Sequence, residues 1–431
     1  MSRTTRSGPP ASGPPASGTT APADDAPATP TRWLLLRYPD LARIWLGHSL
    51  SLLGSHLSTL ALPLLVLDAT GSAALAGLVG TTRMLTYLVS NLPAGALADR
   101  LSRRGLLVLA DLLRAAAVLV VGIALWAGHT PSVVVLLAVG AVDTAVSAVA
   151  GPAGTASLRH LVSPDDIPRA LVLDNNRRLA LGLVGPLAGG ALYQLAPALP
   201  FLLDGITYGA SLLLILSVRR HLGGGGASTT STLRQDVADG IRFVVRTRFV
   251  LLFMIWATLV NFATGGMTFG VVILIGPDHA APLGVAMTVL TLAGIVGSTL
   301  APRLFSCGQQ RLVQVSTASS VVVGIVIALF PDPVVAVALV AARSLIAPAA
   351  GILFNTRVFE LVPDAMTGRV QSALYLIGGA LTPFATLVSG WLCEQHSPST
   401  AFAVFAAMLA AVLVLTCLPA MRQPSATADP A

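Results

Sequence analysis

The sequence predicts an all-α membrane protein with twelve transmembrane helices in two six-helix bundles related by pseudo-symmetry. First, 54% of the 431 residues are hydrophobic and only 10% are charged, whereas soluble chains carry about a quarter charged residues. Second, the apolar residues gather in runs that approach the roughly 20 residues needed to cross a bilayer. Third, the runs form two sets of six with a longer polar stretch between them, which is typical of an internal repeat.

The apolar runs follow one another with short loops between most of them. In chain order, the spans are expected at 42–67, 72–95, 104–127, 131–153, 177–196, 199–218, 249–275, 281–302, 311–330, 333–354, 368–392 and 399–420.

Composition divides the rest of the chain. Residues 1–31 are rich in Pro, Ala, Ser, Gly and Thr and have no apolar core, so we expect a disordered cytoplasmic tail rather than a signal peptide. The bundles are expected over 32–218 and 249–420, with a cytoplasmic linker at 219–248 and a second disordered tail at 421–431. Apolar residues at helical spacing near the end of the linker predict a short amphipathic helix on the inner membrane surface.

Arginine sets the expected orientation. All 26 basic residues are Arg, and all but Arg83, Arg114 and Arg343 lie in segments that the twelve-span order places on one side. The loops on the other side contain no Arg. Because positive loops stay in the cytoplasm, we expect a multi-pass protein of the cell inner (plasma) membrane with both termini cytoplasmic.

Composition also excludes several classes of protein. Without Lys there can be no P-loop and no pyridoxal Schiff base, so an ATPase or a pyridoxal enzyme is excluded. The three cysteines are far apart and show no metal or disulfide spacing. The basic residues are dispersed in short loops, which does not suggest nucleic acid. We therefore expect no cofactor, no metal, no nucleic-acid partner and no enzymatic activity.

The stretch from Gly95 to Arg104 predicts a tight cytoplasmic hinge between two spans. Asp99, Arg100, Arg103 and Arg104 cannot lie in hydrocarbon, and Gly95 allows close helix approach. These charges could latch one of two domain arrangements. The alternative is that they only set the topology and the turn.

The fifth expected span, 177–196, contains a second cluster. Pro186 frees a carbonyl and kinks the helix, while Gly185, Gly189 and Gly190 allow backbone-to-backbone packing. This run suggests a hinge or a gate that seals one side. The alternative is ordinary packing of small residues.

Taken in order, these motifs resemble those of the major facilitator superfamily over about residues 38–420. The hinge is similar to the family pattern Gly-x-x-x-Asp-Arg-x-Gly-Arg-Arg/Lys, with Ser102 replacing the second Gly. The fifth expected span, 177–196, matches the Gly-Pro-x-x-Gly-Gly motif of drug:proton antiporters. The resemblance implies the twelve-helix fold and a latch role for the hinge. It also implies a central cavity that the first, fourth and tenth expected spans (42–67, 131–153 and 333–354) help to line. Three segments look like the subgroup of macrolide-efflux and enterobactin-exporter proteins: Asp111-Leu-Leu-Arg114, Phe201-Leu-Leu-Asp204 and Pro363–Arg369.

Buried charges are the best candidates for a transport site. Arg83, Asp143 and Arg343 are expected near the bilayer midplane, where a charge needs a partner or a water-filled cavity. Asp143 is the candidate protonation site, with Arg83 or Arg343 as its counter-charge. The alternative is a static buried salt bridge.

Other polar residues in the spans have weaker claims. His48 and His56 lie two turns apart on helix 1 and could relay protons, although neutral imidazoles with local hydrogen bonds are the alternative. Asp111 and Arg114 are expected to satisfy each other structurally. Three further residues are candidate cavity groups: Trp256, Asn261 and Asn355.

The leading functional hypothesis is a monomeric secondary transporter that exports a small amphipathic compound, such as an antibiotic, a drug or a siderophore-like natural product. Its partners would be that small molecule, protons and the lipid bilayer. Solute uptake or lipid flipping on the same fold is the alternative. A membrane-embedded enzyme and a non-transporting sensor rank lower, because neither a clustered site nor an added soluble domain is visible.

Overall fold

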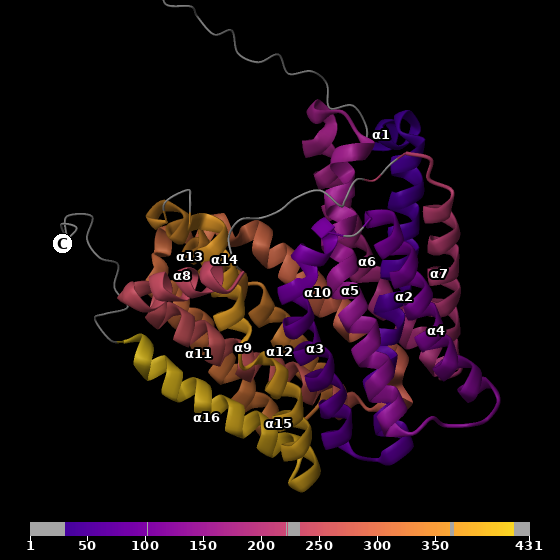
Figure 1. Ribbon diagram of the computed structural model, residues 1–431. Coiled ribbons are helices and arrows are strands. Elements are labelled where there is room, and N and C mark those ends of the chain that lie inside the picture. The colour runs from indigo at the N-terminus through magenta and orange to yellow at the C-terminus, as the bar shows by residue number, and fades with distance from the viewer. Residues whose placement is uncertain (1–30, 101, 221, 223–232, 363–365, 418–431) are drawn as a thin grey trace, which may run out of the picture.

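The computed structural model describes residues 31–100, 102–220, 222, 233–362 and 366–417, and every regular element in these ranges is a helix (Figure 1). The tails expected at 1–31 and 421–431 lie outside the described residues, apart from Thr31. The first group is α1 (Thr31–Arg37), α2 (Pro39–Thr70), α3 (Ala73–Arg100), α4 (Arg103–Trp126), α5 (Val133–Leu161), η1 (Pro164–Asp166), α6 (Ile167–Leu195) and α7 (Leu199–Leu216). The second group is α8 (Leu233–Arg246), α9 (Arg248–Ile275), η2 (Pro277–His279), α10 (Ala280–Leu304), η3 (Phe305–Cys307), α11 (Gln309–Leu329), α12 (Pro333–Ser344), α13 (Ala347–Leu361), α14 (Thr367–Gly379), α15 (Thr382–Gln395) and α16 (Pro398–Thr416).

Within the described ranges, 10 helical stretches are long and apolar enough to cross a membrane, where α12 with α13 and α14 with α15 each make one stretch. They match ten of the twelve expected spans. The other two expected spans, 72–95 and 177–196, are also helical, as α3 and α6. Both are more polar, because α3 contains Arg83 and the first turns of α6 contain several charged residues. The all-α, multi-pass fold is confirmed, and the full count of twelve crossings stays a prediction.

The helices α5 and α6 run further than hydropathy predicted. The sequence placed a loop between 153 and 177, but α5 continues to Leu161 and α6 begins at Ile167. The extensions are polar, so they carry no hydropathy signal for a span. Asp174 accepts hydrogen bonds from Arg177 and Arg178, three and four residues later, and such pairs stabilise a helix outside the apolar core.

Two expected single helices are broken. The span at 333–354 is divided into α12 and α13, and the span at 368–392 into α14 and α15. A proline ring clashes with the carbonyl four residues earlier and lacks the N–H that would bond to it. Pro348 lies four residues after Ser344, where α12 ends, and Pro383 lies four residues after Gly379, where α14 ends. The two prolines therefore favour both breaks, but proline does not enforce a break, because α2, α5, α6 and α10 continue past prolines of their own.

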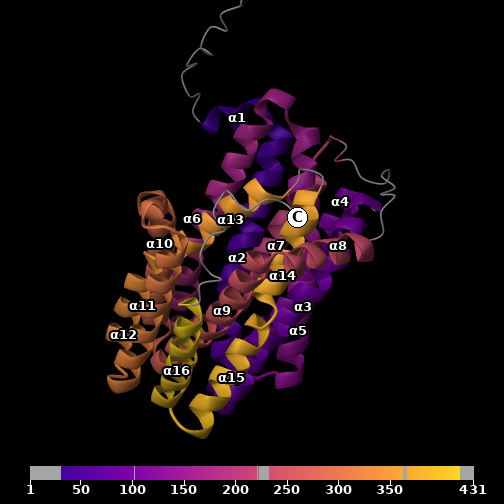
Figure 2. The ribbon, with the colours of Figure 1, turned by 90° about the vertical axis from the view of Figure 1, so that its left-hand side faces the viewer.

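The two groups of helices meet along α3 with α15 and along α6 with α10. Figures 1 and 2 both show α15 lying beside α3. The contact is close, because a Cβ at Gly77 would collide with the Thr386 carbonyl, and Thr81 donates its hydroxyl to the Pro383 carbonyl at 2.7 Å. At the end of this contact, Glu394 accepts hydrogen bonds from Ser72 and from the Ala74 N–H.

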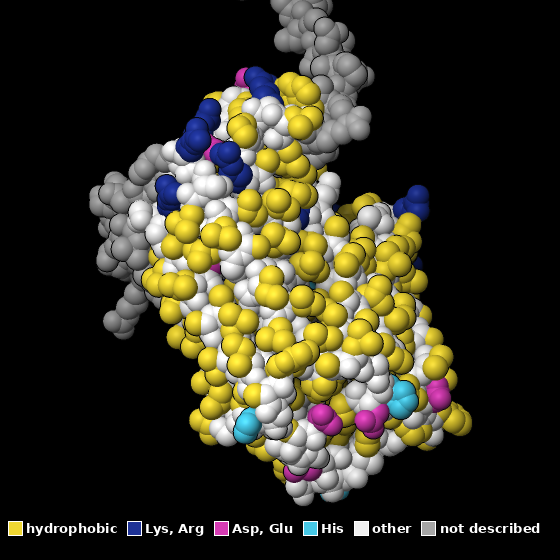
Figure 3. Space-filling model, turned by 90° about the vertical axis from the view of Figure 1, so that its right-hand side faces the viewer, with side chains coloured by type: hydrophobic (Ala, Val, Ile, Leu, Met, Phe, Trp, Pro, Cys, Tyr) yellow, Lys and Arg dark blue, Asp and Glu magenta, His cyan; other side chains and the backbone are white. Residues whose placement is uncertain are grey.

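Charge separates the two ends of the molecule. In Figure 3 the arginines visible on this face gather toward the upper end, where α1 lies in Figure 1, while the His side chains and most of the visible Asp and Glu side chains lie at the opposite end. The α3–α15 contact described above includes Ser72 and Glu394 and lies at the acidic end. Hydrophobic side chains cover the surface between the two ends, as expected for contact with lipid.

The predicted amphipathic helix is present as α8, and it packs against α14. Val244 is fully buried in the core. Gly240 lies against the backbone of Arg369 on α14, and Asp239 forms a 3.3 Å ion pair with the same arginine. The expected apolar face is buried at Val244 but exposed at Val245 (55%), and the contacts with α14 come from Gly240 and Asp239, which a pattern within one helix does not reveal.

Candidate functional site

A cavity of about 1110 Å³ lies between the two groups of helices. The first group contributes residues of α2, α3 and α6, and the second contributes most of the wall. On α13 and α14 the lining extends to Asn355 and Gln371, toward the arginine-bearing end. The candidates Trp256, Asn261 and Asn355 do line this cavity.

One side of the cavity is aromatic. The rings of Phe253 and Phe354 stack with centroids 3.6 Å apart and an interplanar angle of 6°, and Trp256 lies 4.8 Å from Phe253. The Trp256 indole donates to Thr317 at 2.8 Å. Its polar atom is therefore satisfied within the protein. The three side chains are only 3% to 6% exposed, so they support the wall more than they offer surface to a ligand.

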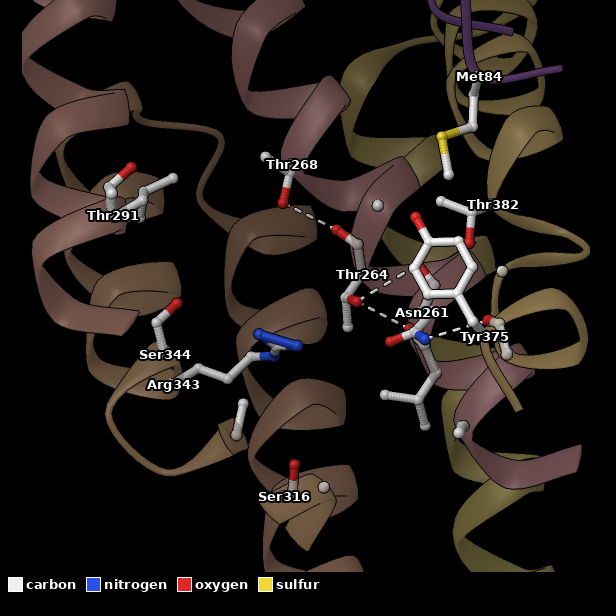
Figure 4. Close-up of a pocket in the computed structure, with 18 of the residues that line it drawn as sticks. Met84, Asn261, Thr264, Thr268, Thr291, Ser316, Arg343, Ser344, Tyr375 and Thr382 are labelled. Carbon is white, nitrogen blue, oxygen red and sulfur yellow. Dashed lines mark hydrogen bonds between the residues drawn. The ribbon is translucent and has the colours of Figure 1, made fainter. Parts of the chain in front are cut away.

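Another side of the cavity is polar but neutral, apart from Arg343 (Figure 4). Asn261 donates to the Gly378 carbonyl at 3.2 Å, next to the break between α14 and α15. Arg343 lies in the last turn of α12 and its Nε donates to Ser320 at 2.8 Å. Among the described residues that line the cavity, none is acidic.

Asp143 is the centre of a buried network in the first group of helices. Its side chain is only 3% exposed and accepts hydrogen bonds from Arg83 at 3.2 Å, Arg114 at 2.9 Å and Tyr208 at 3.0 Å. Of the two candidates, Arg83 pairs with Asp143 and Arg343 does not, and Arg114 adds a second, nearer ion pair. The structure brings Arg83 and Asp143 together and places Arg343 in the other group.

Arg114 corrects one expectation. It was expected to satisfy Asp111, but its Nε donates to Asp143, and its terminal nitrogens donate to Ser51 and Ser55. The guanidinium carbon also lies 4.3 Å from the centre of the Tyr208 ring. The three-residue spacing of Asp111 and Arg114 suggested an ion pair along one helix. The arginine side chain is long enough to reach a carboxylate on a neighbouring helix instead.

Asp204 was recognised only as part of a sequence motif, and the structure adds it to this buried region. It is fully buried in α7, and within the described residues neither carboxylate oxygen has a hydrogen-bond partner. A Cβ at Gly54 would collide with its Oδ1, so α2 approaches it closely. An acidic residue inside an apolar run was the signal that could have marked Asp204 as a site candidate.

The network lies one layer behind the cavity wall. The same Arg83 nitrogen that bonds to Asp143 also donates to Thr59 at 3.0 Å. Thr59 and its neighbour His56 line the cavity, whereas Asp143 does not. A change in the Arg83–Asp143 pair can therefore reach the cavity through a single hydrogen bond.

The two histidines of α2 have different surroundings. His56 lines the cavity and packs against Gly185 of α6. His48 is not among the lining residues; it lies against Gly154 of α5, and its Nε2 is buried without a hydrogen-bond partner among the described residues. The geometry therefore brings only His56 to the cavity.

The Gly-Pro-x-x-Gly-Gly motif at residues 185–190 lies on α6, where this helix crosses two neighbouring helices. Gly185 and Gly189 face α2, at His56 and Leu57. One residue further round the helix, Pro186 and Gly190 face α10: the ideal Cβ of Gly190 would be 2.9 Å from Gly284 Cα. The four motif residues thus form two contacts, one within the first group and one between the groups.

Only part of the predicted hinge can be placed. The side chains of Gly95, Asp99 and Arg100 lie outside the described residues, although the helix α3 extends to position 100. Arg103 donates to the Leu222 carbonyl at 3.1 Å, and Arg104 donates to the Leu216 carbonyl. The two arginines therefore tie the start of α4 to the end of α7 and to the chain that follows it.

Comparisons with known proteins agree on one family. A model described as "Major Facilitator Superfamily" matches residues 44–386. The multidrug efflux pump Tap of Mycobacterium tuberculosis is 28% identical over 392 residues, which cover 86% of this chain and 91% of that protein. Tap of Mycolicibacterium fortuitum is 29% identical over 397 residues, covering 86% and 93%.

Solved transporters share the fold at low identity. The nucleoside transporter NupG superposes with a TM-score of 0.67 and 14% identity, covering 88% of this chain and 98% of that chain. A bacterial homolog of the human lysosomal transporter Spinster, in an inward-facing and unoccupied conformation, gives a TM-score of 0.66 and 15% identity, covering 90% and 95%. At these identities the likeness concerns the fold alone.

Proposed function

The chain belongs to the Major Facilitator Superfamily of transporters, and from this premise we propose that it is a proton-coupled exporter of a small amphipathic compound. The observation that carries the proposal is the large cavity between two groups of helices that meet at the acidic end. Such a cavity, closed at one end, is one of the two states that alternating access requires. Its aromatic and neutral polar walls suit an antibiotic, another drug or a siderophore-like natural product.

The proposed orientation follows from the arginines. We take the arginine-bearing end as cytoplasmic, with both termini inside, because positive residues are retained in the cytoplasm. The described conformation would then face inward in the cell inner membrane. In the opposite state the bundles at 32–218 and 249–420 would separate along α3–α15 and α6–α10, with 219–248 as the linker and the protein acting as a monomer.

The glycine-rich run of α6 is the proposed outer gate. Gly190 and Gly284 bring α6 and α10 together at backbone distance, and Thr288 donates to the Leu183 carbonyl at 2.9 Å in the same contact. A seam of small residues closes tightly but leaves few side-chain bonds to break when it opens. The hinge around Asp99 and Arg100 is the proposed latch at the cytoplasmic end, with Gly95, Arg103 and Arg104 supporting its turn.

Asp143 is the proposed proton carrier, with Arg83 as its counter-charge. Protonation of Asp143 would weaken its bond to Arg83 and release that guanidinium toward Thr59 at the cavity. Arg114 and Tyr208 would keep Asp143 in position during the exchange. His56, on the cavity wall, is the proposed relay to solvent, while His48 and Arg343 have no contact with this pair in the described structure.

Export is favoured over the alternatives by the relatives. Tap is named a multidrug efflux pump and matches most of this chain, whereas the nucleoside transporter shares only the fold. Uptake or lipid flipping on the same scaffold remains the second candidate.

Flux measured in inside-out vesicles tests the proposal. With an acidic lumen, the vesicles should accumulate substrate and lose protons, and collapsing the pH gradient should stop both. Accumulation that needs an alkaline lumen would indicate proton-coupled uptake instead. Flux that does not depend on the pH gradient would refute coupling to protons.

A further inference from the structure

Arg343 differs from the other two arginines within the apolar helices. Arg83 and Arg114 both bond to Asp143, so the first group of helices neutralises its buried positive charges. Arg343 has a single hydrogen bond from Nε to the Ser320 hydroxyl, at 2.8 Å, and no acidic partner among the described residues. A cation inside a membrane protein is costly unless it is paired or faces water. The positive charge of Arg343 in α12 must therefore be stabilised by something other than an acidic side chain among the described residues.

The guanidinium of Arg343 is directed into the cavity. Figure 4 shows it extending from α12 toward the open space in front of Asn261 and Thr264 on α9. Its terminal nitrogens are not among the buried polar atoms that lack a partner, so they remain accessible from the cavity. Five N–H groups in a planar fork match a carboxylate or another anionic oxygen pair.

The rest of the cavity narrows the class of ligand. None of its described lining residues is acidic, so nothing within the wall competes with a ligand for Arg343. The neutral hydrogen-bonding groups Asn261 and Thr264 face the guanidinium across the space. The partly buried side chains of Met287 and Leu290 on α10 provide an apolar surface on the same cavity.

Building on the proposed export function, we propose that the cavity selects amphipathic organic anions. One carboxylate of the ligand binds the Arg343 guanidinium, and its apolar body lies against Met287 and Leu290. A cationic drug is disfavoured, because it would meet a positive charge with no carboxylate nearby. The membrane potential, negative inside, then assists export of the anion in addition to the proton gradient.

A matched pair of fluorescent probes tests this selection on the purified full-length protein. Dansyl-phenylalanine carries a carboxylate, and dansyl-phenylalanine amide has nearly the same shape without the charge. Binding is followed by energy transfer from tryptophan, since Trp256 lines the cavity. We expect wild-type protein to bind the acid on the order of tenfold to a hundredfold more tightly than the amide, the range of a charged hydrogen bond.

The variants separate charge at this position from charge elsewhere. Arg343→Gln should abolish the preference for the acid by weakening acid binding to about the level of the amide, and Arg343→Lys should retain much of the preference. Arg357→Gln, which removes an exposed arginine from α13, serves as the control for net charge and should behave as wild type. Size-exclusion profiles of each variant show whether the fold is retained.

Three outcomes would overturn the proposal: equal binding of acid and amide by the wild type, a preference that survives in Arg343→Gln, or no binding of either probe. Flux measurements in vesicles separate a failure of the anion-selection proposal from a failure of the proposed export function. Proton-driven efflux of neutral or cationic compounds without any preference for anions would refute anion selection alone. Absence of proton-driven efflux for every compound would instead refute the proposed function.

Discussion

Arg83 on α3 and Asp143 on α5 form a 3.2 Å ion pair behind the cavity wall, and the same arginine nitrogen donates to Thr59, which borders the cavity. The pair is therefore neither a ligand-binding group nor remote from the ligand. A proton that reached Asp143 would change the hydrogen bonding of the wall without occupying the space of the substrate. The first prediction tests this relationship.

Asp143→Asn is expected to reduce proton-driven flux at least tenfold while substrate still binds, because the amide keeps the size of the side chain but cannot exchange a proton. It also leaves Arg83 and Arg114 without a buried counter-charge, which costs about 3 kcal/mol of stability. Flux in proteoliposomes and equilibrium binding measure the two effects separately. Asp239→Asn on α8 is the matched control, and retained coupling in Asp143→Asn would exclude Asp143 as the carrier.

Gly190→Ala should prevent full closure between α6 and α10. The added methyl would collide with the Ala280 carbonyl and come within 2.9 Å of Gly284 Cα, so the helices must separate. We expect a leaky or inactive transporter whose outer end is labelled more rapidly by thiol reagents at a cysteine introduced at Ala281. Gly209→Ala on α7 is the control, since nothing lies within 4 Å of its ideal Cβ. Equal labelling in both variants would contradict the role of Gly190 as a gate.

Glu394 should stabilise the closed outer end. Its carboxylate accepts hydrogen bonds from the Ser72 hydroxyl at 2.6 Å and the Ala74 N–H at 2.9 Å, at the positive N-terminus of α3. Glu394→Gln removes the charge and should weaken closure. Distances between spin labels on α3 and α15 would then show a several-fold larger open population. The exposed Glu360→Gln variant should not change this distribution, and an unchanged distribution in Glu394→Gln would refute the stabilising role.

Asp99→Asn is expected to abolish transport while expression stays near the wild-type level. The proposed latch depends on the charge of Asp99, and loss of that charge does not alter the apolar spans that direct insertion. Flux per molecule in membranes, normalised to protein amount, is the measurement. Wild-type flux would show that the hinge charges only set topology.

Asp166 predicts a pH-dependent contribution to stability outside the membrane. The hydroxyl of Tyr38 donates to it at 2.8 Å, and this bond holds the pKa of Asp166 below its usual value, helped by Ser163 and Arg37 and opposed by burial. A lowered folded-state pKa stabilises above the unfolded value, about 3.9, and is lost as pH falls through the folded value. Tyr38→Phe should therefore melt at a lower temperature than wild type at pH 7, and the difference should shrink below about pH 4. A constant difference at all pH values would indicate lost packing instead.

Hydropathy located the helices well because it is a local property. Each expected apolar run coincides with a helix. The breaks at Ser344 and Gly379 lie four residues before prolines, but other helices continue past theirs, so proline alone does not predict a break. The ends of α5 and α6 could not, because helix that projects beyond the bilayer is polar and resembles a loop. Sequence spacing was least reliable for arginines: Arg114 was assigned to Asp111 on its own helix but bonds to Asp143 on another.

The sequence by itself determined the membrane class, the expected spans and the charged residues that needed partners, since these follow from composition and from the order of apolar and basic residues. Only the tertiary structure decided which partners were chosen. It joined Asp143 to Arg83, left Arg343 facing the cavity, and brought Gly190 against Gly284. The physical reason is that hydropathy acts on each segment separately, whereas ion pairs and backbone contacts depend on which helices pack side by side.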